Sequence, residues 1–340
     1  MTFLENIDLL PYNTFKIQAN ARYFAVIRTI DDVSELLASK LFRTKPYLFL
    51  GGGSNILFSK DFDGLVIKME IKGIEVTHET DDTVTIHAGA GENWHAFVMY
   101  CVEHNYGGLE NLSLIPGTSG AAPMQNIGAY GVEIKDVILS VEAIEISSGR
   151  KISFSNEECQ FGYRESIFKQ HAKDKYIITG INVLLTRRNH KLNISYGAIK
   201  ETLKTMNVEE PTIKQVSDAV IHIRRTKLPD PTYVGNAGSF FKNPSIPTSL
   251  FNDIKQNYPT IPSYPGADDL IKVPAGWLIE QCGWKGKTLD KIGVHAHQAL
   301  VIVNYGGGEG KDIWALAMEI RESVMSKFNI TLQPEVNVVM

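Results

Sequence analysis

Apolar and polar residues alternate along much of the first half of the chain with the two-residue period of half-buried β-strands. Apolar runs at 21–30 and 47–50 flank a stretch over 33–40 with helical spacing, which Asp31 or Asp32 can cap. The order of strand, helix and strand predicts a β-α-β unit. Short strands separated by turn or acidic residues predict an antiparallel region and a mixed α+β domain, at 64–68, 74–76 and 83–88.

The rest of the chain continues with both periods. Asn93 can cap a helix over 94–103, and a Ser-Ser-Gly turn between strands at 137–146 and 151–154 predicts a hairpin. An apolar strand at 176–185 precedes a polar linker, where the first folding unit is expected to close. Further elements are predicted as helices at 212–225, 250–257, 275–282 and 313–328 and as strands at 299–304 and 330–336.

Length and charge narrow the class of protein. The chain has 340 residues, which predicts two domains or three, and its formal net charge of -4 argues against a nucleic-acid-binding protein. No apolar run approaches the ~20 residues that span a bilayer, so a cytoplasmic protein that does not bind membranes is expected. Cys101, Cys159 and Cys282 have neither metal nor disulfide spacing and are expected to be buried thiols.

Two glycine-dense stretches are candidates for binding an anionic cofactor. Gly51-Gly52-Gly53-Ser54-Asn55 follows an apolar strand, and bare backbone N–H groups of this kind can form a concavity for a pyrophosphate. A simple glycine turn is the alternative. The second stretch, 114–131, combines glycines with Ser, Gln and Asn over a length typical of functional loops. Two such clamps fit an extended dinucleotide better than one small ligand.

Three polar residues stand out from their surroundings. Ser239 lies in GNAGSFFKNP (235–244), where two phenylalanines can anchor a turn and the hydroxyl can give or accept a proton, with a simple Gly-Ser hairpin turn as the alternative. Arg164 follows a Gly-aromatic pair and can clamp a carboxylate, although a surface charge is the bland alternative. Glu335, inside an apolar pattern, is a candidate acid because an unpaired buried carboxylate is costly.

Other charged residues allow two interpretations. Arg224, Arg225 and Lys227 end a predicted helix, where cations favour the helix dipole and can equally receive a diphosphate. His95 and His104 have no partner at metal spacing, so packing or surface roles are expected and no metal site is predicted.

Taken together, these motifs resemble one family over nearly the whole chain. GGGSN, PGTSGAAPMQNIGAYG, FGYR, SYG, TKLPDP, GNAGSFFKNP, AGWLIEQCGWKG and LQPEV occur in the order found in type I UDP-N-acetylenolpyruvoylglucosamine reductases. The resemblance implies an α+β fold with a two-part FAD-binding domain of the vanillyl-alcohol-oxidase type and a smaller α/β substrate-binding domain. The implied divisions are 1–70 and 71–225 for FAD and 226–330 for substrate, with 331–340 returning to the first.

The resemblance also implies which residues hold the cofactor. FAD would bind non-covalently, since neither clamp carries a histidine or cysteine for attachment, and NADPH would be the hydride donor. The implied cofactor residues are Gly51, Gly52, Gly53, Ser54, Asn55, Ile56, Pro116, Gly117, Ser119, Gly120, Gln125, Asn126, Gly128, Ala129, Tyr130 and Gly131.

The implied reaction reduces the enolpyruvyl ether of UDP-N-acetylglucosamine enolpyruvate to UDP-N-acetylmuramate. Hydride from flavin N5 would reach C3, Ser239 would protonate C2, and Arg164 with Glu335 would stabilise the charge that develops on the carboxylate. The implied substrate-binding residues are Tyr196, Lys227, Asn243, Tyr264, Lys285 and Gln298. A monomer is expected. A hydroxy-acid or sugar-alcohol oxidase of the same fold and a flavin-free nucleotide-sugar-binding protein are the alternatives.

Overall fold

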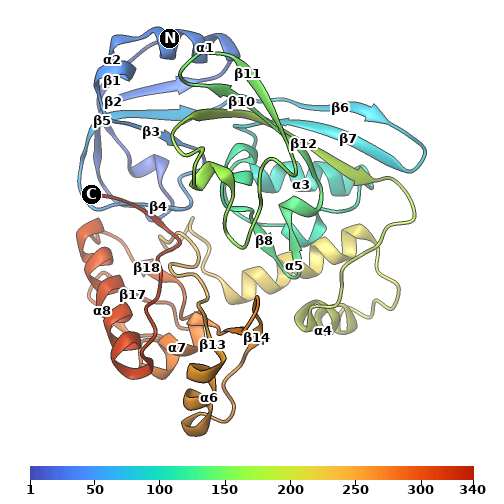
Figure 1. The fold of residues 1–340 in the computed structure, drawn as a ribbon, viewed down its shortest axis with the longest axis vertical. Coiled ribbons are helices and arrows are strands. Elements are labelled where there is room, and N and C mark those ends of the chain that lie inside the picture. The colour runs from blue at the N-terminus through green and yellow to red at the C-terminus, as the bar shows by residue number, and fades with distance from the viewer. The chain divides into compact units, whose positions relative to one another are not determined.

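A computed structural model describes residues 1–340, whose elements run from β1 (Leu4–Asp8) to β19 (Asn337–Val339), as labelled in Figure 1. The residues group into two units. Unit 1 comprises 1–5, 23–52 and 63–226, and unit 2 comprises 6–22, 53–62 and 227–340. Each unit is therefore assembled from segments that are far apart in the sequence.

Unit 1 holds most of the sheet structure. Its strands are β2 (Asn20–Ile27), β3 (Tyr47–Leu50), β5 (Phe62–Met69), β6 (Ile74–Glu79), β7 (Thr83–Gly89), β8 (Gly128–Ala129), β9 (Val132–Glu133), β10 (Ile138–Glu145), β11 (Lys151–Ser155) and β12 (Tyr176–Thr186), of which β2 and β5 begin in unit 2. Its helices are α1 (Ile30–Ala38), α2 (Lys40–Thr44), α3 (Trp94–Glu103), α4 (Gly197–Thr205) and α5 (Ile213–Lys227), whose last residue falls in unit 2.

Two sheets organise most of these strands, while β8 and β9 pair with each other. One has the order β1-β2-β5-β3 and the other the order β11-β10-β12-β7-β6. The predicted hairpin is confirmed by antiparallel pairing of β10 with β11, and the predicted antiparallel region by the pairing of β6 with β7. The predicted order of strand, helix and strand is confirmed by β2, α1, α2 and β3, and the two strands share one sheet in which β5 lies between them.

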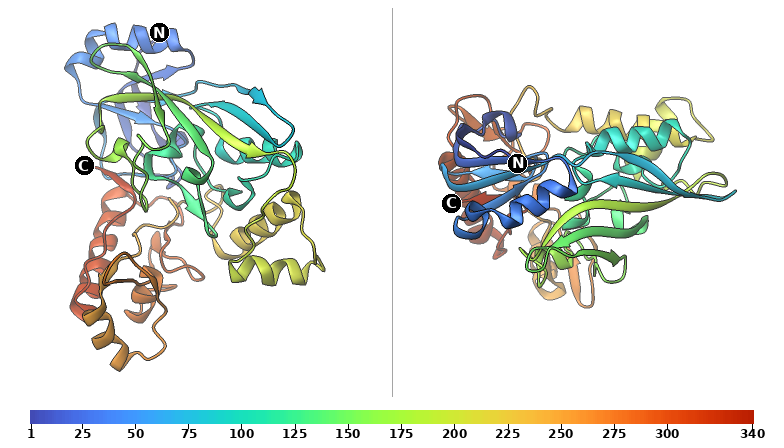
Figure 2. Two further views of the ribbon diagram at one scale, coloured as in Figure 1. Left: turned by 45° about the vertical axis from the view of Figure 1, so that its right-hand side comes forward. Right: turned by 90° about the horizontal axis from the view of Figure 1, so that it is seen from above.

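The main core of unit 1 lies between the five-stranded sheet and α3. Val84 and Ile86 on β7 and Ile181 on β12 are fully buried, together with Phe97 and Val98 of α3. Figures 1 and 2 show this helix lying against the sheet. The α3 prediction is confirmed in its bounds and cap, since Asn93 Oδ1 accepts a hydrogen bond from the Ala96 N–H (2.9 Å).

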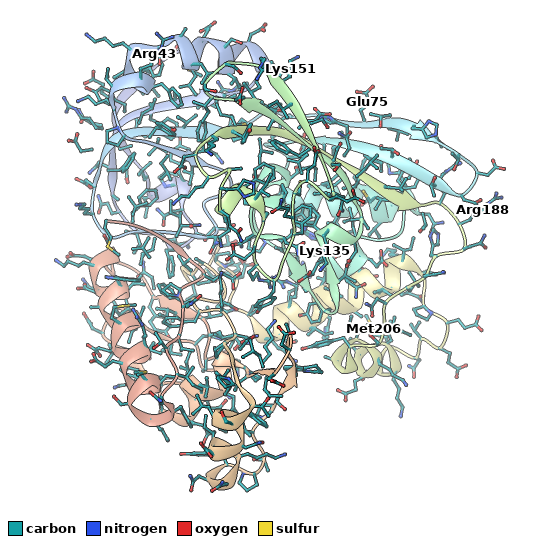
Figure 3. The ribbon with its side chains drawn as sticks, viewed as in Figure 1. Arg43, Glu75, Lys135, Lys151, Arg188 and Met206 are labelled. Carbon is teal, nitrogen blue, oxygen red and sulfur yellow. The ribbon has the colours of Figure 1, made fainter.

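Many charged side chains of unit 1 lie on its surface, although Glu110 is buried. Figure 3 shows Arg43, Glu75, Lys151 and Arg188, and all four are exposed.

Cys101 and Cys159 are buried as predicted, whereas Cys282 of unit 2 is only partly buried, and all three are free thiols. Burial raises the pKa of Cys159 to about 12, because a thiolate would lose its hydration there.

Unit 2 holds shorter elements. They are β4 (Ile56–Phe58), β13 (Ser245–Pro247), β14 (Tyr264–Pro265), β15 (Leu270–Lys272), β16 (Thr288–Leu289), β17 (Ile292–Val294), β18 (Ile302–Asn304), β19 and the helices α6 (Thr248–Asn257), α7 (Ala275–Gln281) and α8 (Gly310–Phe328). β19 pairs in parallel with β4, with Asn337 opposite Ile56. No helix in the chain combines the length and apolar character needed to cross a membrane.

Several predicted boundaries are wrong for physical reasons. Helix α1 begins at Ile30 because Thr29, rather than Asp31 or Asp32, is its N-cap, while Asp32 completes a capping box by accepting the Thr29 N–H (2.9 Å). The strand predicted over 330–336 is absent. The apolar pattern of Ile330, Leu332 and Val336 reflects their burial in the core without strand pairing, and the strand follows at 337–339. The strand predicted over 299–304 is formed only by 302–304, and α4 was not predicted.

Candidate active site

The two glycine stretches meet within unit 1. A Cβ added to Gly52 would lie 2.8 Å from the Cα of Gly117, and one added to Gly51 would lie 2.7 Å from Thr118 Oγ1. At Gly52 the close atom belongs to the backbone, so only glycine lets the two backbone segments touch there, whereas at Gly51 it belongs to the Thr118 side chain. Gly51 and Gly52, which follow β3, therefore share one surface of peptide groups with the start of the second stretch.

The second stretch is laid along the chain between β7 and α3. Ser119 N–H donates to the Glu92 carbonyl (2.9 Å) and Gly120 N–H to the Ala90 carbonyl (2.9 Å). In return, Gly117 accepts from the Trp94 N–H (3.1 Å), and the buried Ser119 hydroxyl donates to the Gly89 carbonyl (3.0 Å). The loop 114–131 also contains two short 3-10 helices, Ser119–Ala121 and Pro123–Gln125, so it is more ordered than its sequence predicted.

A buried asparagine fixes the far part of this loop. Asn126, which has φ 45°, donates from Nδ2 to Glu133 Oε2 (2.9 Å) and to the Gly162 carbonyl (2.9 Å), and its Oδ1 accepts from the Lys135 N–H (3.1 Å). Asn126 thus joins the glycine loop to the FGYR turn, 36 residues further along the chain.

Arg164 comes from that turn and faces the same loop. Its Nη2 donates to the Gly128 carbonyl (2.9 Å), and its own φ of 56° is uncommon for a side chain of this size. The structure therefore brings Arg164 to the predicted cofactor residues Gly128–Ala129 of β8.

Tyr130 and Tyr196 also lie together in unit 1. Their ring centroids are 5.3 Å apart at an interplanar angle of 88°, which is an edge-to-face contact. Tyr196 stands at the N-cap of α4 and is 43% exposed. Asn193 Nδ2 donates to the carbonyl of Gly131 (3.0 Å), so the Tyr196 segment is attached to the end of the glycine loop.

In unit 2, Ser239 lies in a turn held by its backbone and by two buried rings. Phe240 N–H donates to the Leu300 carbonyl (2.8 Å), and Ser239 forms a bridge with Val301. Phe240 and Phe241 are 0% and 1% exposed, which confirms the predicted apolar anchor.

Glu335 lies next to this turn. Its N–H donates to the Phe240 carbonyl (2.8 Å), and Lys242 N–H donates to the Gln333 carbonyl (2.9 Å), so the two segments run side by side. Asn55 Nδ2 donates to the Glu335 carbonyl (3.3 Å). Ser239 and Glu335, 96 positions apart by their numbers, thus occupy adjacent backbone segments, and Glu335 is half-buried.

The GGGSN stretch continues into unit 2 at Gly53. Gly53 has φ 66°, and a Cβ there would lie 1.9 Å from the Tyr12 carbonyl oxygen, so glycine is required twice over. Its carbonyl accepts from the Thr14 N–H (3.0 Å). Gly53, Ser54, Asn55 and Ile56 therefore belong to a different unit from Gly51 and Gly52.

The predicted substrate residues of unit 2 divide into two groups. Asn243 Oδ1 accepts from the Ala275 N–H at the start of α7 (2.9 Å), and Gln298 Oε1 lies 3.2 Å from a Cβ built on Gly276. These two amides therefore border the same end of α7. The other three are surface residues: Tyr264 is 52% exposed in β14, Lys285 pairs with Glu280 (2.9 Å), and Lys227 ends α5.

Three further residues contact the glycine loops, and two of them, Lys68 and Asn111, were missed by sequence reasoning. Lys68 donates from Nζ to the Gly51 carbonyl, and burial lowers its pKa. Asn111 is 1% exposed and donates to the Tyr130 carbonyl (3.0 Å), and Arg224 contacts Leu114. A lysine or an asparagine inside an apolar pattern was the signal that could have identified Lys68 and Asn111. Their hydrogen-bond partners are distant in the sequence and gave no further sign.

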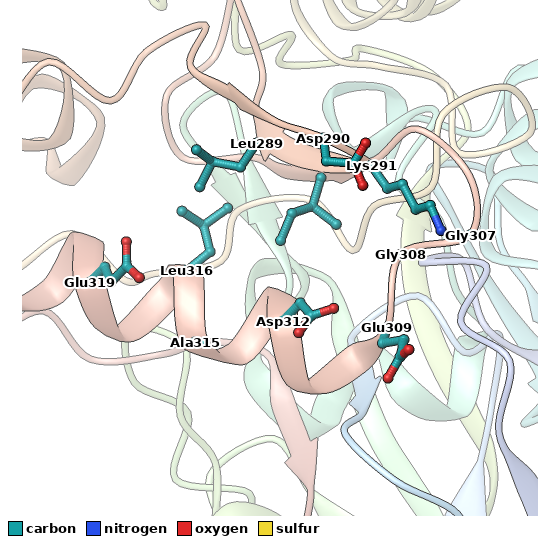
Figure 4. Close-up of a pocket in the computed structure, with 11 residues that line it drawn as sticks. Leu289, Asp290, Lys291, Gly307, Gly308, Glu309, Asp312, Ala315, Leu316 and Glu319 are labelled. Atoms are coloured by element: carbon teal, nitrogen blue, oxygen red, sulfur yellow. The ribbon is translucent and has the colours of Figure 1, made fainter.

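A cavity of about 350 Å³ elsewhere in unit 2 is separate from these residues. It lies between the β16–β17 turn and the start of α8, and Asp290, Lys291, Glu309 and Asp312 are among the residues that line it (Figure 4). None of the predicted site residues lines this cavity, so no role in the site follows from it.

Comparison with known proteins gives two family matches. Residues 21–155 match a family described as FAD binding domain. Residues 230–339 match the family described as UDP-N-acetylenolpyruvoylglucosamine reductase, C-terminal domain.

Individual relatives match the whole chain. The UDP-N-acetylenolpyruvoylglucosamine reductase of Amoebophilus asiaticus is 51% identical, with 100% of each chain covered. That of Flavobacterium johnsoniae is 48% identical, again over 100% of each chain. A solved structure of the reductase from Thermus caldophilus superposes with a TM-score of 0.68 at 22% identity, covering 99% of this chain and 98% of the other, which shows a shared fold.

Proposed function

The chain belongs to the UDP-N-acetylenolpyruvoylglucosamine reductase family, and from this premise we propose how its own residues carry out the reaction. The protein is an oxidoreductase that uses FAD and NADPH to reduce the enolpyruvyl ether of UDP-N-acetylglucosamine enolpyruvate. The product, UDP-N-acetylmuramate, is a peptidoglycan precursor. The observation that carries this conclusion is 51% identity over the full length of both chains, together with a match to both domain families.

The fold is α+β, with an FAD-binding domain of the vanillyl-alcohol-oxidase type and a second, smaller domain. We propose that 1–70 and 71–225 are the two parts of the FAD-binding domain and that 226–330 binds substrate. The pairing of β19 with β4 supports a return of 331–340 to the N-terminal region.

The glycine stretches fit FAD. Gly51, Gly52 and Gly117 present touching backbone segments without side chains, which is the surface a diphosphate can approach. We therefore propose that 51–56 and 116–131 hold FAD non-covalently. FAD held there would supply the hydride transfer that links NADPH to C3 of the enolpyruvyl group.

Ser239 is proposed to protonate C2 in the same reduction. Its proton leaves Oγ for C2, and solvent restores it afterwards, which keeps the serine neutral between turnovers. The backbone bonds on either side of Ser239 hold the hydroxyl in a fixed turn. Adjacent Glu335 supports this assignment, since a carboxylic acid there can hydrogen bond to the substrate carboxylate.

Arg164 is proposed to stabilise the negative charge that spreads into the substrate carboxylate. A guanidinium remains charged at any working pH and offers a planar pair of donors that matches a carboxylate. Its bond to the Gly128 carbonyl supports the role, because this contact holds the side chain against the proposed cofactor loop before substrate arrives.

The UDP part of the substrate is proposed to contact six residues. Tyr196, Lys227 and Asn243 meet the phosphates, and Tyr264, Lys285 and Gln298 meet the rest of the nucleotide sugar. Tyr196 is exposed and Lys227 is the last residue of α5, so both side chains can contact a ligand without disturbing core packing, which supports the assignment. We also propose that the protein is a monomer and that it acts in the cytoplasm. Its three free cysteines are suited to that reducing compartment.

A spectral experiment tests the proposal. The purified protein should be yellow, lose its oxidised-flavin bands when NADPH is added without oxygen, and regain them on addition of the enolpyruvyl substrate. A flavin that NADPH leaves oxidised would favour the oxidase, and a colourless protein would favour the nucleotide-sugar-binding alternative.

A further inference from the structure

One side chain of unit 1 joins the two ends of the loop 114–131. Arg224 Nε donates to the Leu114 carbonyl (3.2 Å), and its guanidinium lies close enough to the Tyr130 hydroxyl for the two groups to interact electrostatically. Leu114 is the first residue of the loop, and Tyr130 is next to last. A single guanidinium, carried on helix α5, therefore bridges a gap of 16 positions in the chain.

Both residues that Arg224 holds are in unfavourable backbone conformations. Leu114 has φ 57° and Tyr130 has φ 50°, a region that side chains rarely occupy. Such a conformation persists where the surroundings fix it. At Leu114 they fix both sides of the residue, since its N–H donates to His95 Nδ1 (3.0 Å) while its carbonyl accepts from Arg224. Burial lowers the pKa of His95, and nearby Arg225 and Arg224 lower it further, which keeps Nδ1 an acceptor.

The connection extends from Tyr130 to the Tyr196 segment. The Tyr130 ring meets the Tyr196 ring edge to face, and Asn111 Nδ2 donates both to the Tyr130 carbonyl (3.0 Å) and to the Asn193 carbonyl (2.8 Å). Movement of Tyr130 would therefore displace the segment that carries Tyr196.

We propose that Arg224 is a positioning residue that holds the glycine loop and the Tyr196 segment in one arrangement. The inference rests on the proposed function, in which 116–131 hold FAD and Tyr196 meets the substrate. The sequence allowed Arg224 either to interact with the helix dipole or to bind a diphosphate. Its two contacts instead indicate that it positions the loop. Loss of the guanidinium should loosen cofactor and substrate binding together.

A set of matched variants tests the proposal. Arg224→Met keeps the apolar stem and removes both polar contacts, Tyr130→Phe removes only the hydroxyl, and Lys214→Met changes an exposed cation at the other end of α5 as the control. Bonds to a charged donor correspond to roughly 10- to 100-fold in affinity. We expect Arg224→Met to raise the Kd for FAD by this factor and to raise the substrate KM more than it lowers kcat. Tyr130→Phe should have a smaller effect that vanishes in the Arg224→Met background, and Lys214→Met should bind FAD normally.

Hydrogen exchange of the FAD-free protein separates the connection from the cofactor assignment. Arg224→Met should exchange faster at 114–131 and 193–196, and Arg224→Lys, which keeps the charge if the methionine variant does not fold, should lie between. Wild-type exchange and wild-type FAD affinity in both variants would overturn the proposal. Faster exchange with unchanged FAD affinity in Arg224→Met and Tyr130→Phe would uphold the connection and instead refute the assignment of FAD to this loop.

Discussion

The two polar segments that carry the proposed chemistry are held by different kinds of interaction. In unit 1, side chains hold backbone groups: Asn126 binds Gly162, Arg164 binds Gly128 and Arg224 binds Leu114. In unit 2, pairs of backbone groups such as Phe240 with Leu300 and Glu335 with Phe240 are prominent, and the side chains of Asn55 and Asn236 add to them. The geometry of unit 1 therefore depends strongly on polar residue identity, whereas backbone pairing and buried rings supply much of the support for the turn around Ser239.

This difference predicts how each region responds to substitution. A change at Ser239 removes one hydroxyl and leaves its supports in place, so it should separate chemistry from structure. A change at Arg164 removes a charge and a support together. The predictions below use this contrast, beginning with the largest expected effect.

Ser239→Ala should abolish proton delivery while FAD binding and reduction by NADPH remain normal. A positioned proton donor is worth ~10²–10⁴-fold in rate. Stopped-flow measurement of each half-reaction should show the loss only when the enolpyruvyl substrate is added. Ser239→Cys should retain more activity because a thiol can still donate, and alanine turning over at the wild-type rate would leave Ser239 a turn residue.

Arg164→Lys should reduce turnover by roughly 10- to 100-fold, because one ammonium cannot replace two parallel guanidinium donors. Unlike Ser239→Ala, it should also alter the flavin spectrum slightly, since the bond to the Gly128 carbonyl is lost. Thermal unfolding should change little. Turnover equal to wild type would refute the proposed role of Arg164 and the expected difference between substitutions at Arg164 and at Ser239.

Tyr196→Phe should raise the substrate KM by about 10-fold, the value of one good hydrogen bond, while reduction by NADPH is unchanged. The edge-to-face contact with Tyr130 survives because it needs only the ring. Steady-state kinetics at varied substrate, with single-turnover reduction as the control, would measure this. Equal damage to both half-reactions would place Tyr196 at the flavin instead.

The smallest effect is expected from an ion pair on the five-stranded sheet, away from either region. His87 Nε2 lies 3.5 Å from Glu142 Oε2, and hydrogen bonding to His87 lowers the pKa of Glu142 to about 2 while the same bond raises the pKa of His87. Glu142 stabilises the fold above its ordinary pKa of 4.5 and loses this as the pH falls toward 2. His87 stabilises it below 6.5 and loses this as the pH rises through its raised pKa.

The pair is therefore most stabilising between about pH 4.5 and 6.5. Both side chains are partly exposed, so solvent limits its contribution to about 1 kcal/mol. Urea unfolding of wild type, Glu142→Gln, His87→Gln and the double variant should show a coupling energy that is larger at pH 5.5 than at pH 8.5. A coupling independent of pH would contradict the charged pair.

Sequence reasoning succeeded where local chemistry decides the structure. Asn93 was identified as the cap of α3 because capping needs only a side chain and the N–H three residues on. Ser239 and Glu335 were named from their neighbours, and the structure brings their segments together. Roles set by distant partners were not predictable. Arg224 contacts Leu114 across 110 positions, and the sequence around Lys68 is that of an ordinary strand, which gives no sign of its contact with Gly51.

The pairing of β4 with β19 bears on the order in which the chain acquires structure during its synthesis. Asn55 and its partner Glu335 are separated by 280 residues, so the ribosome must add those 280 residues after Asn55 before the two residues can meet. At ~5–20 residues per second, Asn55 waits about 14–60 s for this partner. Unit 1, whose segments all precede Lys227, can collect its strands from the emerging chain meanwhile. During that interval β4 is an apolar strand without its parallel neighbour, the state in which a nascent chain most needs a chaperone.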